Sequence, residues 1–189
     1  MPFKIKEILK NIFKKTTPIT PTQTTEILKQ LEQNLNIELI GSENIAFNSL
    51  GTLTSLRLAD CEVKCKDLEL IGKLTGLEHL GLACNRIVEI EGLDNLTSLI
   101  YLSLPHNEIT EMKMKGLNRN LKYLELGDNQ IEEIKGLWGL RNLKSLSLGG
   151  NRIYKIQGFW FLKHLACIYL NGNPIENKIC STDNIKIYY

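Results

Sequence analysis

Three residues with metal-binding side chains recur at one spacing along the chain. Cys84, His106 and Asp128 lie 22 residues apart, so a repeating structure would align them along one edge. A thiolate, an imidazole and a carboxylate are suitable zinc ligands. Asp60 and Gly150 hold the equivalent positions on either side, however, and the chain has no Cys-x-x-Cys pair. We therefore interpret the row as solvated loop residues and predict no metal site.

The remaining reactive side chains do not form a catalytic set. His79, His106 and His164 fall at three different positions relative to the 22-residue spacing. The sequence contains no glycine-rich phosphate loop, nucleophile elbow or paired-acid motif. We predict that the protein is not an enzyme and binds no cofactor.

The spacing itself belongs to a repeated phrase, Leu-x-x-Leu-x-Leu-x-x-Asn. In a strand, Leu80 and Leu82 would point inward, while His79 and Gly81 would point outward. The turn after each strand leaves backbone groups without ladder partners, and a buried asparagine amide can satisfy them on its own turn and the next. Five units of the phrase end at Asn85, Asn107, Asn129, Asn151 and Asn173. We predict that these asparagines are a structural ladder and not a ligand site.

An additional unit precedes these five. The segment 53–61 has the same frame with Cys61 in the asparagine position, and it lies 24 residues before the next unit. The two extra residues are most easily placed between Val63 and Leu68, in a loop on one face. Residues 53–175 thus contain six units, each of which must bury its apolar face against a neighbour.

The second half of each unit carries a resemblance to a known family. Residues 85–93, 129–137 and 151–159 share Asn-x-Ile-x-x-Ile-x-Gly-apolar. This pattern resembles the 22-residue class of leucine-rich repeat found in the protein phosphatase-one regulatory subunit, the dynein leucine-rich light chain and tubulin-folding cofactors, and it is close to that of internalins. The resemblance implies an α/β solenoid with a parallel concave β-sheet, short convex turns or 3-10 segments and a helical N-terminal cap. It also implies a non-catalytic scaffold or regulatory adaptor. The Asn107 unit departs from the pattern at Lys115 and Asn118, so its convex turn should be irregular.

The outward positions of the predicted strands are the candidate binding surface. They form two rows that stack from repeat to repeat. Tyr101 and Tyr123 are adjacent and flanked by small residues, a composition typical of binding hot spots. A tyrosine ladder that only stabilises the sheet is an equal alternative. The partner-binding residues predicted from the two rows are Arg57, His79, Tyr101, Tyr123, Glu125 and Tyr169.

Two tryptophans suggest a second surface. Trp138 and Trp160 lie one period apart, with Phe159 and Phe161 nearby, and could form an exposed apolar ridge on the outer turns. Packing in the core is the alternative that we favour, because Leu137 and Phe159 hold the predicted inward positions.

The N-terminal part of the chain divides into three segments before the repeats. Residues 1–15 form a basic amphipathic helix with a net charge of +4, within a chain whose formal charge is only +2. Residues 16–22 form a linker with Pro18 and Pro21, and residues 23–52 form a cap whose helix begins near Thr24. The small total charge argues against nucleic-acid binding, whereas residues 1–15 suit an anionic membrane surface.

The C-terminal residues 176–189 leave the register. We expect them to fold over the last repeat, although a partner that covers this end, or a longer chain, are alternatives. The odd number of cysteines and the lack of an apolar leader predict reduced thiols in the cytoplasm. We expect a monomer that binds a protein partner, whose identity the sequence does not indicate.

Overall fold

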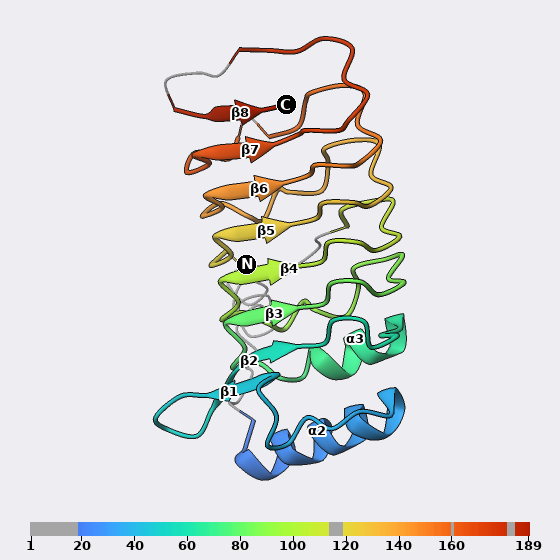
Figure 1. The fold of residues 1–189 in the computed structure, drawn as a ribbon. Helices are drawn as coiled ribbons and strands as arrows, with labels where there is room; N and C mark the ends of the chain where they lie inside the picture. Colours follow the sequence, from blue (N-terminus) through green and yellow to red (C-terminus); the bar gives the residue numbers. More distant parts are fainter. Residues whose placement is uncertain (1–18, 114–118, 160, 181–183) are drawn as a thin grey trace, which may run out of the picture.

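The chain coils into a stack of turns, and each turn adds one short strand to a common sheet (Figure 1). The computed structural model describes residues 19–113, 119–159, 161–180 and 184–189. The eight strands of the sheet follow sequence order, and all pairs are parallel except the first, which is antiparallel. This confirms the predicted solenoid. The helices are α2 (Pro21–Leu35) and α3 (Cys65–Ile71), and the strands are β1 (Ile45–Phe47), β2 (Leu53–Arg57), β3 (His79–Gly81), β4 (Tyr101–Ser103), β5 (Tyr123–Glu125), β6 (Ser145–Ser147), β7 (Cys167–Tyr169) and β8 (Lys186–Tyr188).

The register of the sheet follows the repeat. One inward residue of each strand from β2 to β7 pairs with its equivalent in the next strand, and none of these side chains is more than 1% exposed. They are Leu56, Leu80, Leu102, Leu124, Leu146 and Ile168. The predicted alternation is confirmed, because the leucines fill one continuous core and the residues between them face outward.

The asparagine ladder connects each turn to the preceding one. Asn129 Nδ2 donates to Leu126 O in its own turn and to Leu104 O in the turn before, while Asn129 Oδ1 accepts from the N–H of Ile109. We expected bonds to the following turn, and that direction was wrong. Because the chain has already passed one full turn when it reaches the asparagine, the amide points back at the groups of the completed turn.

The backward direction of these bonds also explains why a cysteine, Cys61, can occupy the first position of the ladder. The N–H groups of Cys61 and Val63 are already accepted by Asn85 Oδ1, and the Cys61 thiol donates to Ala59 O. No repeat precedes this unit, so its ladder residue has no earlier leucine-rich turn to bridge, and a cysteine suffices. Burial raises the pKa of the Cys61 thiol.

The convex turns depend on glycine at one position. Gly136 has φ of 83°, and a Cβ at this position would overlap the carbonyl oxygen of Met112 in the preceding turn. Gly158 has the same relation to the carbonyl of Ile134. Glycine is therefore required here both for the left-handed backbone and for the close stacking of neighbouring turns.

The N-terminal end of the core is covered by α2. Thr20 is the N-cap, its hydroxyl accepts from Gln23 N–H, and Pro21 is the first helical residue. The helix thus begins earlier than the predicted Thr24, because a proline that would break a helix interior is well suited to its first turn. Leu28 and Leu31 are buried against the core, so α2 acts as the predicted cap.

The helix α3 begins in the segment where the two extra residues of the first unit are placed. This helix lies on the side of the stack opposite the strands (Figure 1). The carboxylate of Asp67 is buried, accepts from Lys64 N–H at the helix start and accepts from Asn34 Nδ2 of α2. The insertion therefore links the cap to the repeats, where we had expected only a loop.

The C-terminal tail folds over the last repeat, as expected. Its strand β8 pairs with β7 in parallel, and Ile187 continues the row of buried inward residues at 8% exposure. Only 19 residues separate Ile168 from Ile187, so the final turn is shorter than a repeat.

Four features predicted from the sequence fall outside the described residues. They are the amphipathic helix of residues 1–15, the departures at Lys115 and Asn118, and the second tryptophan of the ridge, Trp160.

Candidate concave binding surface

The outward side chains of β2 to β8 form one surface, which we call the concave face. The structure aligns the two predicted rows in register on neighbouring strands. The first row contains Ser55, His79, Tyr101, Tyr123, Ser145, Cys167 and Lys186, and the second contains Arg57, Gly81, Ser103, Glu125, Ser147, Tyr169 and Tyr188. All six predicted partner-binding residues therefore lie on this single face.

The centre of the concave face is organised by Glu125. One oxygen of its carboxylate accepts from the Tyr101 hydroxyl at 2.7 Å and from the Ser103 hydroxyl at 2.9 Å. Burial, and then the hydrogen bond to the Glu125 carboxylate, raise the pKa of Tyr101. Tyr101 is thus held in place before any partner arrives.

Tyr123 is less constrained than its neighbour. Its side chain is 43% exposed, and its hydroxyl makes no hydrogen bond with any other residue that the structure describes. Small side chains at Ser145 and Ser147 leave a shallow hollow of about 350 Å³ between it and Tyr169. This part of the face presents open aromatic surface.

A stacked pair of tyrosines closes the C-terminal end of the second row. The rings of Tyr169 and Tyr188 are 4.7 Å apart and nearly parallel. Tyr188 was missing from our predicted site because it lies outside the 22-residue register. The alternation of Lys186, Ile187 and Tyr188 is the sequence signal that could have revealed it.

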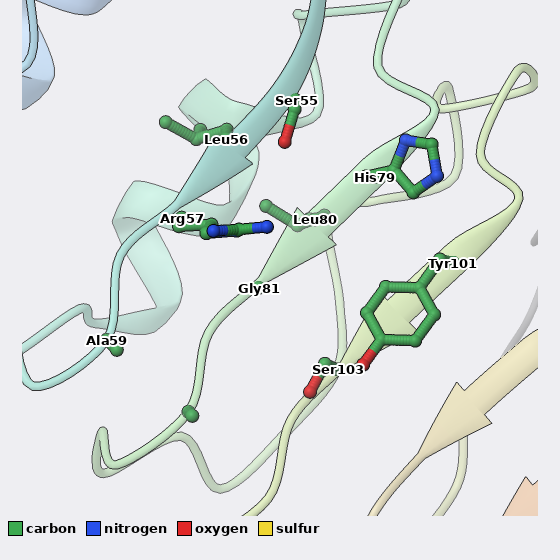
Figure 2. A pocket seen from close by; sticks show the side chains of 10 residues that line it. Ser55, Leu56, Arg57, Ala59, His79, Leu80, Gly81, Tyr101 and Ser103 are labelled. Atoms are coloured by element: carbon green, nitrogen blue, oxygen red, sulfur yellow. The ribbon is translucent and has the colours of Figure 1, made fainter. Parts of the chain in front are cut away.

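A larger hollow, of about 620 Å³, lies at the other end of the face. Figure 2 shows Arg57 reaching from β2 over β3, with His79 and Tyr101 on the rim and Gly81 beneath. The rings of His79 and Tyr101 lie 6.3 Å apart. The absence of a side chain at Gly81 opens the hollow, and sequence reasoning had not singled out this glycine.

The row that resembled a metal site has a backbone role. Asp60, Cys84, His106 and Asp128 all have φ between 52° and 55°, and Gly150 continues the row at 65°. Asp and His tolerate this left-handed conformation better than most residues, and glycine adopts it freely. His106 Nδ1 lies 3.6 Å from Asp128 Oδ2, but the described part of the chain contains no cluster of three potential metal ligands.

The ridge residue Trp138 is exposed, which contradicts the core packing that we favoured. Its side chain is 74% exposed and stacks on Phe161 at 4.3 Å between ring centroids. Leu137 and Phe159 are fully buried, as expected, so the inward positions leave no room for the tryptophan. Because Trp160 lies outside the described residues, the ridge consists here of one tryptophan and one phenylalanine.

Comparison with known proteins supports the repeat fold. The model of the leucine rich repeat family matches residues 109–153 and 119–175. The leucine-rich-repeat ectodomain of the receptor kinase SOBIR1 from Arabidopsis thaliana superposes with a TM-score of 0.61 at 19% identity, covering 89% of this chain and 97% of that one. The functional domain of InlJ from Listeria monocytogenes, which includes a cysteine ladder, gives a TM-score of 0.56 at 22% identity.

The InlJ match covers 71% of this chain and 33% of that one, so this chain spans about a third of the length of that domain. No curated protein sequence matches the chain. Within the described residues, no helix has the length and apolar character needed to cross a membrane. Leucine-rich-repeat domains are generally modules for protein interaction and not enzymes. The repeated strands, the asparagine ladder and these matches agree on the fold: the chain is a solenoid of the leucine-rich-repeat type, and the family model itself matches residues 109–153 and 119–175.

Proposed function

We propose that the protein is a non-catalytic adaptor that binds a protein partner on its concave face, with Tyr101 and Tyr123 as anchors. The observation that carries this proposal is the contrast between the two tyrosines. Tyr101 is pre-oriented by Glu125, whereas Tyr123 is 43% exposed and has the small residue Ser145 beside it on the next strand. A rigid aromatic anchor loses little conformational entropy on binding, and an open one offers apolar area to bury.

The alternative role of the tyrosines, as a ladder that only stabilises the sheet, is less well supported at Tyr123. At 43% exposure, Tyr123 keeps a large part of its ring surface available for a partner to bury. The Tyr101 hydroxyl does stabilise the sheet through Glu125, so we assign it both roles.

An affinity capture with the full chain as bait tests the proposal. The double variant Tyr101→Ala/Tyr123→Ala should bind a partner captured by the wild type about 30-fold more weakly, which corresponds to a loss of about 2 kcal/mol. Tyr154→Ala is the matched control, because Tyr154 is 45% exposed but lies outside the concave face. Equal affinity of the double variant and the control would refute the proposed surface.

The setting of this function is also a proposal. The five cysteines, Cys61, Cys65, Cys84, Cys167 and Cys180, are all free thiols, which suits the reducing conditions of the cytoplasm. We propose a monomeric cytoplasmic scaffold or regulatory subunit, similar in role to the phosphatase regulatory subunit class that its repeats resemble.

A second candidate function, membrane association, is favoured by the sequence of residues 1–15. Five lysines and one glutamate accompany an apolar stripe that includes Ile5, Ile8 and Ile12. A basic amphipathic helix binds anionic lipid through both its charge and its apolar face. Flotation with vesicles of anionic lipid should then carry the full chain to the top fraction, and deletion of residues 1–15 should abolish this. Flotation that is the same for both forms would exclude the anchor.

A further inference from the structure

We infer that the hollow beside Arg57 is a subsite for a carboxylate, supplied by an aspartate or glutamate side chain of the protein partner. This inference rests on the proposed function of the concave face and adds the chemistry of one contact. It identifies the partner segment as acidic at the end of the face formed by β2 and β3.

The Arg57 guanidinium is the first observation. The side chain is exposed, and none of the ion pairs between described residues involves it. The carboxylate nearest along its row, Glu125, is instead occupied by the hydroxyls of Tyr101 and Ser103. Arg57 therefore offers its N–H groups to an incoming acceptor.

The shape of the hollow is the second observation. Gly81 lies next to Arg57 on the neighbouring strand, and a Cβ built there would be 3.6 Å from Arg57 Cγ. A larger side chain would thus occupy the space over which Arg57 reaches (Figure 2). Alanines at positions 59 and 83 keep the adjacent edge of the hollow low. The space of about 620 Å³ is large enough to admit a side chain between Arg57 and the rim residues His79 and Tyr101.

The charges around the hollow favour a monoanion. One guanidinium fork matches the two oxygens of a carboxylate, and Ser55 and His79 add polar groups on the rim. The Glu125 carboxylate lies three strands from Arg57 along the row. Its negative charge raises the pKa of Tyr101, whereas the positive charge of Arg57 lowers that pKa. A phosphate dianion would meet only one arginine and would be repelled by Glu125, so we commit to a carboxylate.

Side-chain NMR of the full chain tests the subsite. The probe is N-acetylglutamic acid α-amide, which carries one carboxylate, and its matched control is the uncharged N-acetylglutaminamide. At constant ionic strength, the Arg57 Nε–Hε signal should shift along a saturable curve with the acid and stay unchanged with the amide. Arg86 and Arg152 follow the ladder asparagines and are exposed outside the concave face, so their signals provide the internal control for non-specific binding.

Two variants separate the shape of the site from its charge. Gly81→Leu keeps Arg57 but fills the hollow. It should lower the affinity for the acid probe at least tenfold. The backbone accepts a side chain at this position, because Gly81 does not have a positive φ and an added Cβ would meet its nearest neighbours at ordinary contact distance. Arg57→Lys keeps the charge but loses the fork, and the affinity for the probe, followed for this variant by the backbone amide signal of Gly81, should also fall.

If the Arg57 signal shifted linearly with probe concentration, and as much as the signals of Arg86 and Arg152, the inference would be overturned. Tighter saturable binding of O-phosphoserine amide than of the acid probe would overturn the choice of carboxylate. In both cases the capture experiment with the tyrosine variants could still succeed, so failure of this subsite is distinguishable from failure of the concave-face function.

Discussion

Replacement of one ladder asparagine is the most direct test of the fold, and Asn129→Leu is the best choice. Leucine has nearly the shape of asparagine, so the substitution opens no cavity and removes only hydrogen bonds. Asn129 is 6% exposed and lies in the middle of the stack. Its side chain makes one bond as acceptor and three as donor.

The expected cost follows from which partners are left without a bond. The N–H of Ile109 is buried and bonds to Asn129 Oδ1, so its loss costs about 1–3 kcal/mol. The carbonyls of Leu104 and Leu126 each keep a second donor, from the ladder asparagines of the neighbouring repeats. The carbonyl of Gly127 keeps the N–H of His106. Each of these three losses should cost roughly 0.5 kcal/mol, which gives a total of about 3 kcal/mol.

Thermal and urea unfolding measure this cost. A domain of this size loses about 2–4 °C of Tm per kcal/mol, so Asn129→Leu should lower Tm by roughly 6–12 °C. The control Asn95→Leu makes the same substitution at an exposed asparagine of the convex segment between β3 and β4 and should change Tm very little. If the two variants melted at the same temperature, the reasoning about the buried ladder would be wrong.

Three further predictions concern other elements. Gly136→Ala should destabilise the protein by well over 1 kcal/mol, because it combines a positive φ with steric overlap, while Gly41→Ala has a similar φ but open space and should cost less; urea unfolding compares them. Because the pKa of Tyr101 is raised in the folded state, its contribution should be constant below pH 10 and fall as the pH rises further, so Tyr101→Phe should lose less stability than the wild type between pH 9 and 11. Asp67→Ala should free Lys64 N–H and Asn34 and speed hydrogen exchange in α2, whereas unchanged exchange would show that Asp67 does not hold the cap.

The sequence predicts those parts of the fold that depend on the period. The strands β3 to β7 lie where the leucines place them, because inward and outward positions alternate within each unit. The outward residues such as Tyr123 follow directly, since a parallel register brings equivalent positions side by side.

Features that depend on contacts between units are harder to predict. Either Leu137 or its neighbour Trp138 could have filled the core. Leu137 is the buried one, and Trp138 is exposed as a result. The helix α3 arises from residues that interrupt the repeat, and β8 arises after the period has ended. The hollow at Gly81 depends on the direction of the Arg57 side chain, which no repeat pattern specifies.

The backward direction of the asparagine ladder has a consequence for synthesis on the ribosome. The hydrogen bonds of the turn after Asn107 are complete only when Asn129 has been synthesised, because Asn129 Oδ1 accepts from the N–H of Ile109. Asn129 follows Asn107 by 22 residues. At about 5–20 residues per second, each turn waits on the order of one to four seconds for its last hydrogen bond. The newest turn of the nascent chain is thus always the least satisfied one, so growth proceeds from a finished N-terminal end toward an open C-terminal end. In the turn of Asn173 the equivalent N–H, that of Ile175, bonds to the backbone carbonyl of Asn173 and not to a ladder asparagine.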